Sequence, residues 1–194
     1  GAANTVETDH FQPVHTVDDT GATVLAQPVP VLFGPANGIL FGLGDPYRPG
    51  HLYWCIPDQP DHWSGSNNYE VCPPSEELMA GFMYGTQPFC FSRERLYGVS
   101  TTACRRGIVS RHAWAIGRGG IYGVATDCVF VTSGGQETPI STDIIRLFRG
   151  ETWNGYAPIN WNFPLAIRLA IDNDILYFLY QDTAGARRVL TLSL

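Results

Sequence analysis

The sequence contains no lysine, so arginine and histidine supply every cationic side chain. Its 194 residues carry a net charge of −6, and adjacent arginines occur only at Arg105–Arg106 and Arg187–Arg188. An acidic chain lacks the basic stripe that sequence-independent DNA binding requires. An acidic protein surface can still let DNA pass along it without binding, because like charges repel. We interpret the two arginine pairs as solvated turns or salt-bridge sites.

Paired cysteines and long apolar runs are also missing. Five cysteines are scattered along the chain, and no two of them form a Cys-x-x-Cys pair: Cys55, Cys72, Cys90, Cys104 and Cys128. This pattern favours buried apolar thiols over a zinc site, with a Cys55–Cys72 disulfide as the alternative. No stretch approaches the roughly 18 apolar residues of a membrane span, so we predict none.

Glycine, proline and aromatic residues are plentiful. The chain has 21 glycines and 14 prolines, its hydrophobic content is 44%, and only 15% of its residues are charged. This composition indicates a folded protein of many short strands and turns and argues against disorder.

One unit recurs: a short aromatic and aliphatic strand, a tight polar turn, and a second such strand. The four copies cover residues 38–43 with 51–56, 88–91 with 95–99, 120–125 with 128–131, and 174–180 with 187–192. Hairpins at intervals of about 40 to 50 residues are typical of stacked β-modules such as propeller blades. We therefore predict an all-β fold of propeller-like blades, forming a partial or small propeller.

Two domains follow from this pattern. Residues 1–30 are polar and end in a proline-rich stretch, which predicts an extended N-terminal arm, and residues 31–194 form the blade domain of about four units. One short helix is expected near 142–149, with Ser141 or Thr142 as its cap and Gly150 as its stop. The predicted core comprises Phe41, Trp54, Phe91, Tyr97, Ile121, Phe130, Tyr177 and Leu179.

No cluster of residues indicates catalysis. His10 and His15 would need a further metal ligand, and none is nearby. An acid–base or metal role for residues of the first hairpin region is weaker than turn chemistry, in which side chains bond to the backbone: Asp45, His51, Asp61 and His62. The stretches 117–120 and 172–174 lack the remaining residues of phosphate and calcium loops and predict hairpin turns. We predict no catalytic residue, no metal and no cofactor.

Aromatic residues in loops are the main candidates for binding. Four of them occur in segments rich in turn formers: Trp63, Trp153, Tyr156 and Trp161. Exposed Trp and Tyr fill a partner's pocket or stack on sugar rings, whereas core packing is the structural alternative. We predict that these four contact a partner.

Four phrases, in order, resemble a known family. They are GPANGILFGLGDPYRPGHLYWCIPDQPDHW, FCFSRERLYGVS, GRGGIYGVATDCVFVTSGGQETPISTDIIRLF, and the final hairpin from NGYAPINW to DILYFLYQDTAGARRVLTL. Together they resemble the β-propeller tail stabilisation or nozzle proteins of short-tailed bacteriophages and their prophage relatives, over roughly residues 30–194.

The resemblance implies a non-enzymatic structural protein of the virion tail, made in the cytoplasm of the host bacterium. It also implies contacts with copies of itself and with other tail proteins around the DNA channel. Proteins of this family are usually several times longer, so we expect a fragment, a separate domain or a short relative. A carbohydrate-binding or glycan-active propeller, with Glu94, Arg95, Tyr97 and Arg111 as candidates, and a cellular interaction propeller are the alternatives.

Overall fold

The computed structural model describes residues 15–17, 23–25, 29–60, 62–64, 66–98 and 101–194. Most of these residues form antiparallel strands, and one short α-helix interrupts them. The predicted all-β class is therefore confirmed. The four predicted hairpins are all present, because β4 pairs with β5, β9 with β10, β13 with β14, and β17 with β18.

Four sheets follow one another along the chain, and we call them blades 1 to 4. Blade 1 has the order β3-β4-β5-β7 (Val31–Ala36, Ile39–Leu43, His51–Trp54, Asn68–Glu70). Blade 2 comprises β8 to β11 (Ala80–Tyr84, Gln87–Phe91, Leu96–Gly98, Thr101–Cys104). Blade 3 comprises β12 to β15 (Trp114–Gly117, Gly120–Val124, Val129–Thr132, Glu137–Pro139). Blade 4 comprises β16, β17 and β18 (Arg168–Asp172, Ile175–Gln181, Arg187–Ser193).

The first strand of each blade lies near the first strand of the next. Strand β3 contacts β8, and β12 contacts β16. Between these pairs, the ring of Phe82 in β8 stacks on Trp114 of β12 with centroids 4.6 Å apart. This arrangement is expected of propeller blades, which are placed around a central channel with their first strands nearest to it.

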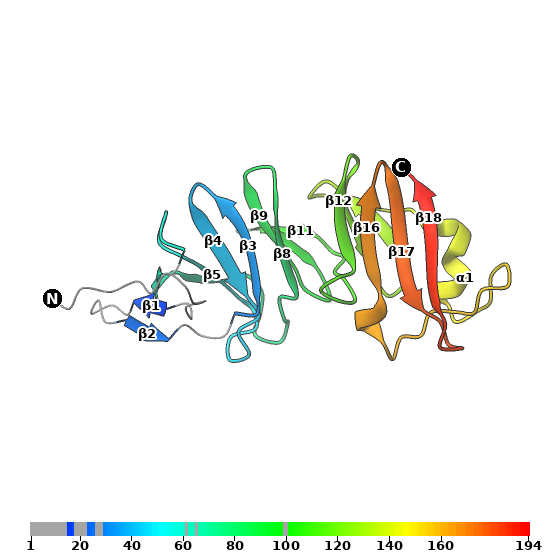
Figure 1. The fold of residues 1–194 in the computed structure, drawn as a ribbon, viewed down its shortest axis with the longest axis horizontal. Helices are drawn as coiled ribbons and strands as arrows, with labels where there is room; N and C mark the ends of the chain where they lie inside the picture. The colour runs from blue at the N-terminus through cyan, green and yellow to red at the C-terminus, as the bar shows by residue number, and fades with distance from the viewer. Residues whose placement is uncertain (1–14, 18–22, 26–28, 61, 65, 99–100) are drawn as a thin grey trace, which may run out of the picture.

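The blades are arranged in a row and do not close into a ring. In Figure 1 they follow one another along the long axis in chain order, with the N-terminal strands at one end and β18 at the other. The predicted partial propeller is thus an open series of four blades.

A glycine allows blades 1 and 2 to approach closely. The ring of Phe33 in β3 lies against Gly81 of β8, where any Cβ atom would collide with it. Gly117 of β12 has a similar role, because an added Cβ would lie 2.7 Å from Ile171 of β16. The side chain of one blade therefore fills the space that glycine leaves in another.

Blade 1 is covered on its far side by a small sheet of order β2-β1-β6 (Thr23–Leu25, His15–Val17, His62–Ser64). Strand β1 runs parallel to β6 and antiparallel to β2. Part of the predicted arm, residues 1–14, 18–22 and 26–28, lies outside the described residues.

The predicted helix is present as a 3₁₀ turn, η1 (Thr142–Ile144), followed by α1 (Ile145–Phe148). Gly150 ends it with a φ of 79°, and the N–H of Glu151 bonds to the carbonyl of Arg146, as in a Schellman motif. The expected side-chain cap is absent, because the Oγ of Ser141 instead accepts the backbone N–H of Val129 in β14.

Half of the predicted core lies fully inside. Phe91, Tyr97, Ile121 and Phe130 are buried, whereas Phe41, Trp54, Tyr177 and Leu179 are half-buried. In β17 the prediction is wrong by one position, since the side chains that face blade 3 are Leu176, Phe178 and Tyr180.

All five cysteines are free and buried, as predicted. Cys55 packs with Tyr53 and Trp63, whereas Cys72 packs with Leu52 on the other side of the blade. Because the two thiols lie on opposite faces, the alternative Cys55–Cys72 disulfide does not form. Burial raises the pKa of Cys72 to about 12, which keeps this thiol protonated.

Candidate partner-binding site

Trp63 is buried, as in the core-packing alternative. It lies in β6 with only 3% of its surface exposed, and its Nε1 donates to the carbonyl of Pro60 at 2.9 Å. Its ring covers Gly42 of β4, where an added Cβ would be 3.2 Å away. Trp63 is therefore a core residue that holds the small N-terminal sheet against blade 1.

Trp153 and Tyr156 form one tight turn after the helix. Their backbones exchange two hydrogen bonds, of 3.0 and 2.8 Å, and the residues between them, Asn154 and Gly155, both have positive φ. These are the features of a type I′ turn. The two rings stack on each other with centroids 6.0 Å apart.

Trp161 lies further along the same segment, with its ring 6.0 Å from Phe148 of α1. Trp153, Tyr156 and Trp161 are each half-buried. The segment from residue 151 to η2 (Pro164–Ala166) thus packs over α1 and blade 4. A partner contact of these three aromatics stays a prediction.

An arginine of blade 4, itself held by an ion pair, lies over the aromatic turn. The Nε of Arg188 in β18 donates to the Oδ2 of Asp182 at 2.7 Å, and its guanidinium lies 5.6 Å from the centre of the Tyr156 ring. Asp182 is fully buried, and its Oδ1 accepts the N–H of Ala186 at 2.8 Å. The hydrogen bond from Arg188 holds the pKa of Asp182 below its ordinary value.

A cleft of about 400 Å³ opens between this turn, the helix and β18, and we call it the β18 cleft. Its apolar wall consists of Val129, Ile140, Ile144, Trp153, Tyr156, Leu176, Phe178, Leu190 and Leu192. Its polar residues are Ser141, Asp143 and Asn154. Val189 and Thr191 border the cleft at the edge of β18, because their side chains alternate to the other face of the sheet. The carboxylate of Asp143 is exposed there, and it makes no ion pair with any residue that the structure describes.

Strand β18 is the edge of its sheet. Within the described part of the chain it pairs with β17 alone. Unpaired strand edges carry backbone groups that bind other chains readily.

The two faces of the blade 4 sheet differ in how much other described residues cover them. One face packs on blade 3 through Leu169, Phe178 and Leu176. The other, which we call the outer face, contains the alternate residues of the three strands: Arg168, Ala170, Asp172, Ile175, Tyr177, Leu179, Val189, Thr191 and Ser193. All of these side chains are at least partly exposed, and no ribbon crosses in front of the three strands in Figure 1.

The residues weighed for catalysis have structural roles where the structure describes them. Asp45 is buried, and its carboxylate accepts the N–H of Tyr47 at 2.9 Å and the hydroxyl of Tyr53 at 2.5 Å. His51 Nδ1 lies 2.9 Å from Asn68 Oδ1. Asp61 lies outside the described residues, and His62 is half-buried in β6.

The glycan-site candidates differ in exposure. Tyr97 is buried, and its hydroxyl donates to Glu76 at 2.9 Å, whereas Glu94, Arg95 and Arg111 are exposed. His10 lies outside the described residues, and only the backbone of His15 is described. Among the described residues, no three His, Cys, Asp or Glu side chains are grouped to hold a metal.

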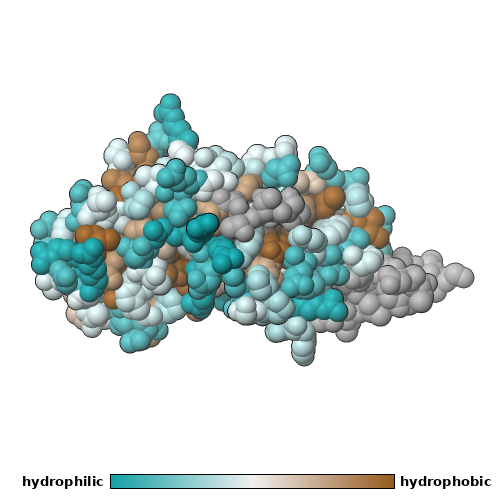
Figure 2. Space-filling model, turned by 180° about the vertical axis from the view of Figure 1, so that it is seen from behind, coloured by the Kyte–Doolittle hydropathy of each residue, from teal (hydrophilic) through white to brown (hydrophobic). Residues whose placement is uncertain are grey.

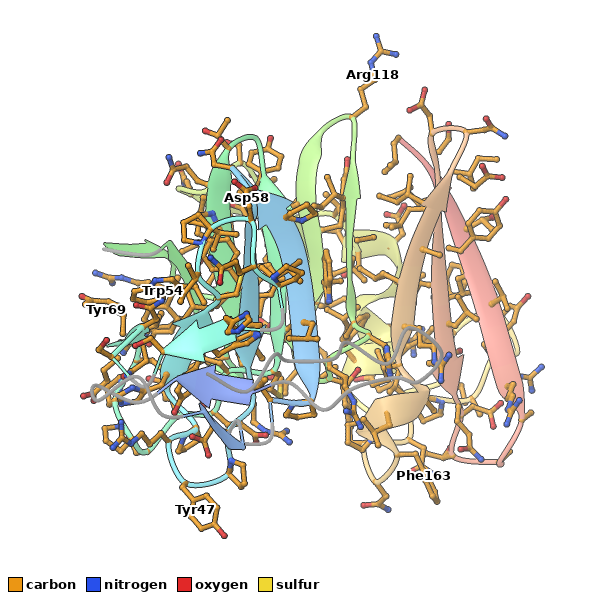
Figure 3. All side chains as sticks on the ribbon, turned by 60° about the vertical axis from the view of Figure 1, so that its left-hand side comes forward. Tyr47, Trp54, Asp58, Tyr69, Arg118 and Phe163 are labelled. Atoms are coloured by element: carbon orange, nitrogen blue, oxygen red, sulfur yellow. The ribbon has the colours of Figure 1, made fainter. Side chains whose placement is uncertain are left out.

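The two stretches weighed as ligand loops are hairpin turns, as predicted. Residues 118 and 119 connect β12 to β13, and Arg118 points away from the molecule at the tip of this hairpin (Figure 3). Asn173 and Asp174 connect β16 to β17 with φ values of 47° and 61°, which again makes a type I′ turn.

Sequence reasoning missed the main feature of the site, which is the edge of β18 beside the helix. It also omitted Phe163, which is 52% exposed and points away from the body of the molecule, as does Tyr47 in the turn after β4 (Figure 3). On the side seen in Figure 2, outside the grey area, apolar residues form small separate patches among polar ones.

No helix among the described residues is both long and apolar enough to cross a membrane. Neither a scan against protein-family models nor a search of curated proteins finds a match for this chain.

Proposed function

We propose that this protein is a non-enzymatic structural component of a bacteriophage tail, similar to nozzle and tail stabilisation proteins. It assembles through the outer face of blade 4, in contact with copies of itself and with other tail proteins around the DNA channel. It is made in the host cytoplasm and resides in the virion.

The observation that carries this proposal is the outer face of blade 4, over which no other described strand or helix packs. Blades 1 to 3 each pack against the blade that follows, whereas the outer face of blade 4 leaves Ile175 36% and Val189 53% exposed. Blades in a propeller cover such faces with a neighbouring blade. Exposed apolar side chains on the face of a sheet are candidates for contact with a partner.

The charge of the chain agrees with a place beside DNA. A net charge of −6 gives a wall that repels phosphates, so a genome can pass without being held. The link to phage tails in particular comes from the four sequence segments, which in their order resemble nozzle and tail stabilisation proteins.

A charge placed on the outer face tests the proposal. Ile175→Lys should remove assembly of the purified chain, because a lysine on this face would be desolvated on contact. Leu32→Lys is the matched control, since Leu32 is an exposed leucine on blade 1. Antibodies against the chain should label the tails of particles that carry its gene. Labelling absent from all particles would contradict the tail assignment.

A further inference from the structure

We propose that the β18 cleft binds an extended segment of another protein, which adds to β18 as the fourth strand of blade 4. The segment carries apolar side chains at alternate positions and a basic residue that faces Asp143. This inference rests on the proposed function, since it names a partner for the blade through which the protein assembles.

The other blades show what is missing from blade 4. In blades 1, 2 and 3 the third strand pairs with a fourth: β5 with β7, β10 with β11, and β14 with β15. In blade 4 the third strand is β18, and the described residues place no strand at its outer edge. The cleft opens at this edge.

The backbone of β18 is oriented to receive a strand. The N–H of Leu194 bonds to Asp174, and that of Asp182 bonds to Ala186, so even-numbered residues exchange hydrogen bonds with β17 at both ends of the ladder. Antiparallel ladders alternate between bonded and non-bonded pairs. The N–H and C=O groups of Val189 and Thr191 therefore point outward.

The cleft supplies space for side chains next to these backbone groups. Leu192 is 41% exposed, and Leu190 and Ile144 are half-buried around it. A strand paired with β18 would direct every second side chain into this space and cover the three residues. Strand addition gains its affinity from backbone hydrogen bonds and its selectivity from such sites.

Charge favours a basic segment. Asp143 is exposed at the cleft and has no partner among the described residues, and the net charge of the chain is −6. The ion pair of Arg188 with Asp182 leaves Asp143 as the unpaired charge at this site. A basic residue in the bound segment would form a charge-assisted hydrogen bond with it.

A sugar fits this cleft less well. Sugar rings stack on the open face of an aromatic side chain, but Trp153 and Tyr156 stack on each other, and Arg188 covers the Tyr156 ring. The aromatic pair is instead a rigid end wall for the cleft.

The test uses the full chain and a synthetic peptide of alternating valine and threonine with one terminal arginine. Binding is followed by fluorescence anisotropy, and amide hydrogen exchange is followed at Val189 and Thr191. Thr191→Pro removes an outward N–H that an edge strand does not need for its own sheet. Thr191→Ala is the matched control that keeps this N–H. A second control is the same peptide with alternate amides methylated.

We expect saturable binding, slower exchange at both amides, and a loss of about tenfold or more in affinity with Thr191→Pro or with the methylated peptide. Thr191→Ala should bind as the unchanged chain does, and Asp143→Asn should weaken binding mainly at low salt. The proposal is overturned if the peptide does not bind, or if it binds the proline and alanine variants equally. If Thr191→Pro fails to fold, binding of the methylated peptide to the unchanged chain tests the same backbone hydrogen bonds. Equal affinity for the methylated and unmethylated peptides would then overturn the proposal.

The outer-face variant separates this inference from the proposed function. Ile175→Lys should abolish assembly and leave peptide binding intact, because Ile175 lies outside the cleft. Assembly without peptide binding would overturn strand addition alone. Peptide binding by a chain that never assembles and labels no particle would overturn the tail role alone.

Discussion

Phe130 lies inside the largest apolar cluster, and none of its side chain is exposed. Its ring meets Phe91 of blade 2 edge-on at 6.4 Å, so it connects two blades. Phe130→Ala should lower the free energy of unfolding by about 3 to 5 kcal/mol, because it removes a buried ring and leaves a cavity. Urea unfolding measures this effect.

The matched control for Phe130 is Phe163, which is largely exposed. Phe163→Ala should change stability by no more than about 0.5 kcal/mol. Equal losses in the two variants would contradict the packing of blade 2 on blade 3.

Asp182 should make the last hairpin sensitive to acid. Arg188 holds the pKa of Asp182 below its ordinary value, so the unfolded chain takes up a proton at a higher pH than the folded chain. The ion pair therefore contributes its full stability at neutral pH, and this contribution is lost as the pH falls below about 4. Asp182→Asn should be less stable than the unchanged chain at pH 7.

Denaturant unfolding over a series of pH values checks this prediction. The difference in stability between the unchanged chain and Asp182→Asn should shrink as the solution is acidified. A difference that stays constant down to the acid limit of folding would show that Asp182 is not held by Arg188.

At the scale of elements, the close approach of β3 and β8 between blades 1 and 2 depends on one glycine. Gly81→Ala should destabilise the fold by about 1 to 3 kcal/mol, because the added methyl group overlaps the ring of Phe33. Gly135→Ala is the control, since a Cβ there meets nothing within 4 Å. Thermal unfolding of both variants distinguishes them, and equal melting temperatures would contradict the packing of Phe33 on β8.

The hairpins could be predicted from the sequence because their signals are local. Turn residues such as Asn173 and Asp174 tolerate positive φ, and apolar runs flank them on both sides. The face of β17 could not be predicted in this way. Residues 175–180 are all apolar, so the alternation that normally identifies the buried face is absent, and the prediction selects the half-buried Tyr177 in place of Leu176, Phe178 and Tyr180.

The role of Trp63 depends on a contact that is distant in sequence. Strand β6 pairs with β1, almost fifty residues earlier, and this small sheet covers the far side of blade 1. A loop rich in proline and aspartate gives no local signal of such a pairing. The aromatic residue was visible in the sequence, but its burial was not.

At the scale of the whole molecule, the β18 cleft combines segments from β14, the helix, the aromatic turn and blade 4. The sequence indicated Trp153 and Tyr156 as binding residues, and both line the cleft. Asp143, Ile144 and the edge of β18 join them only through the packing of the segment between blades 3 and 4. Sequence spacing carries no information on that packing.

The central claim is that four open blades assemble through the outer face of blade 4. Light scattering on the purified full chain, over a range of concentrations and beside Ile175→Lys and Leu32→Lys, tests it most directly. We predict oligomers for the unchanged chain and for Leu32→Lys, and a monomer for Ile175→Lys. A monodisperse monomer for the unchanged chain at every concentration, or oligomers that persist in Ile175→Lys, would contradict the account.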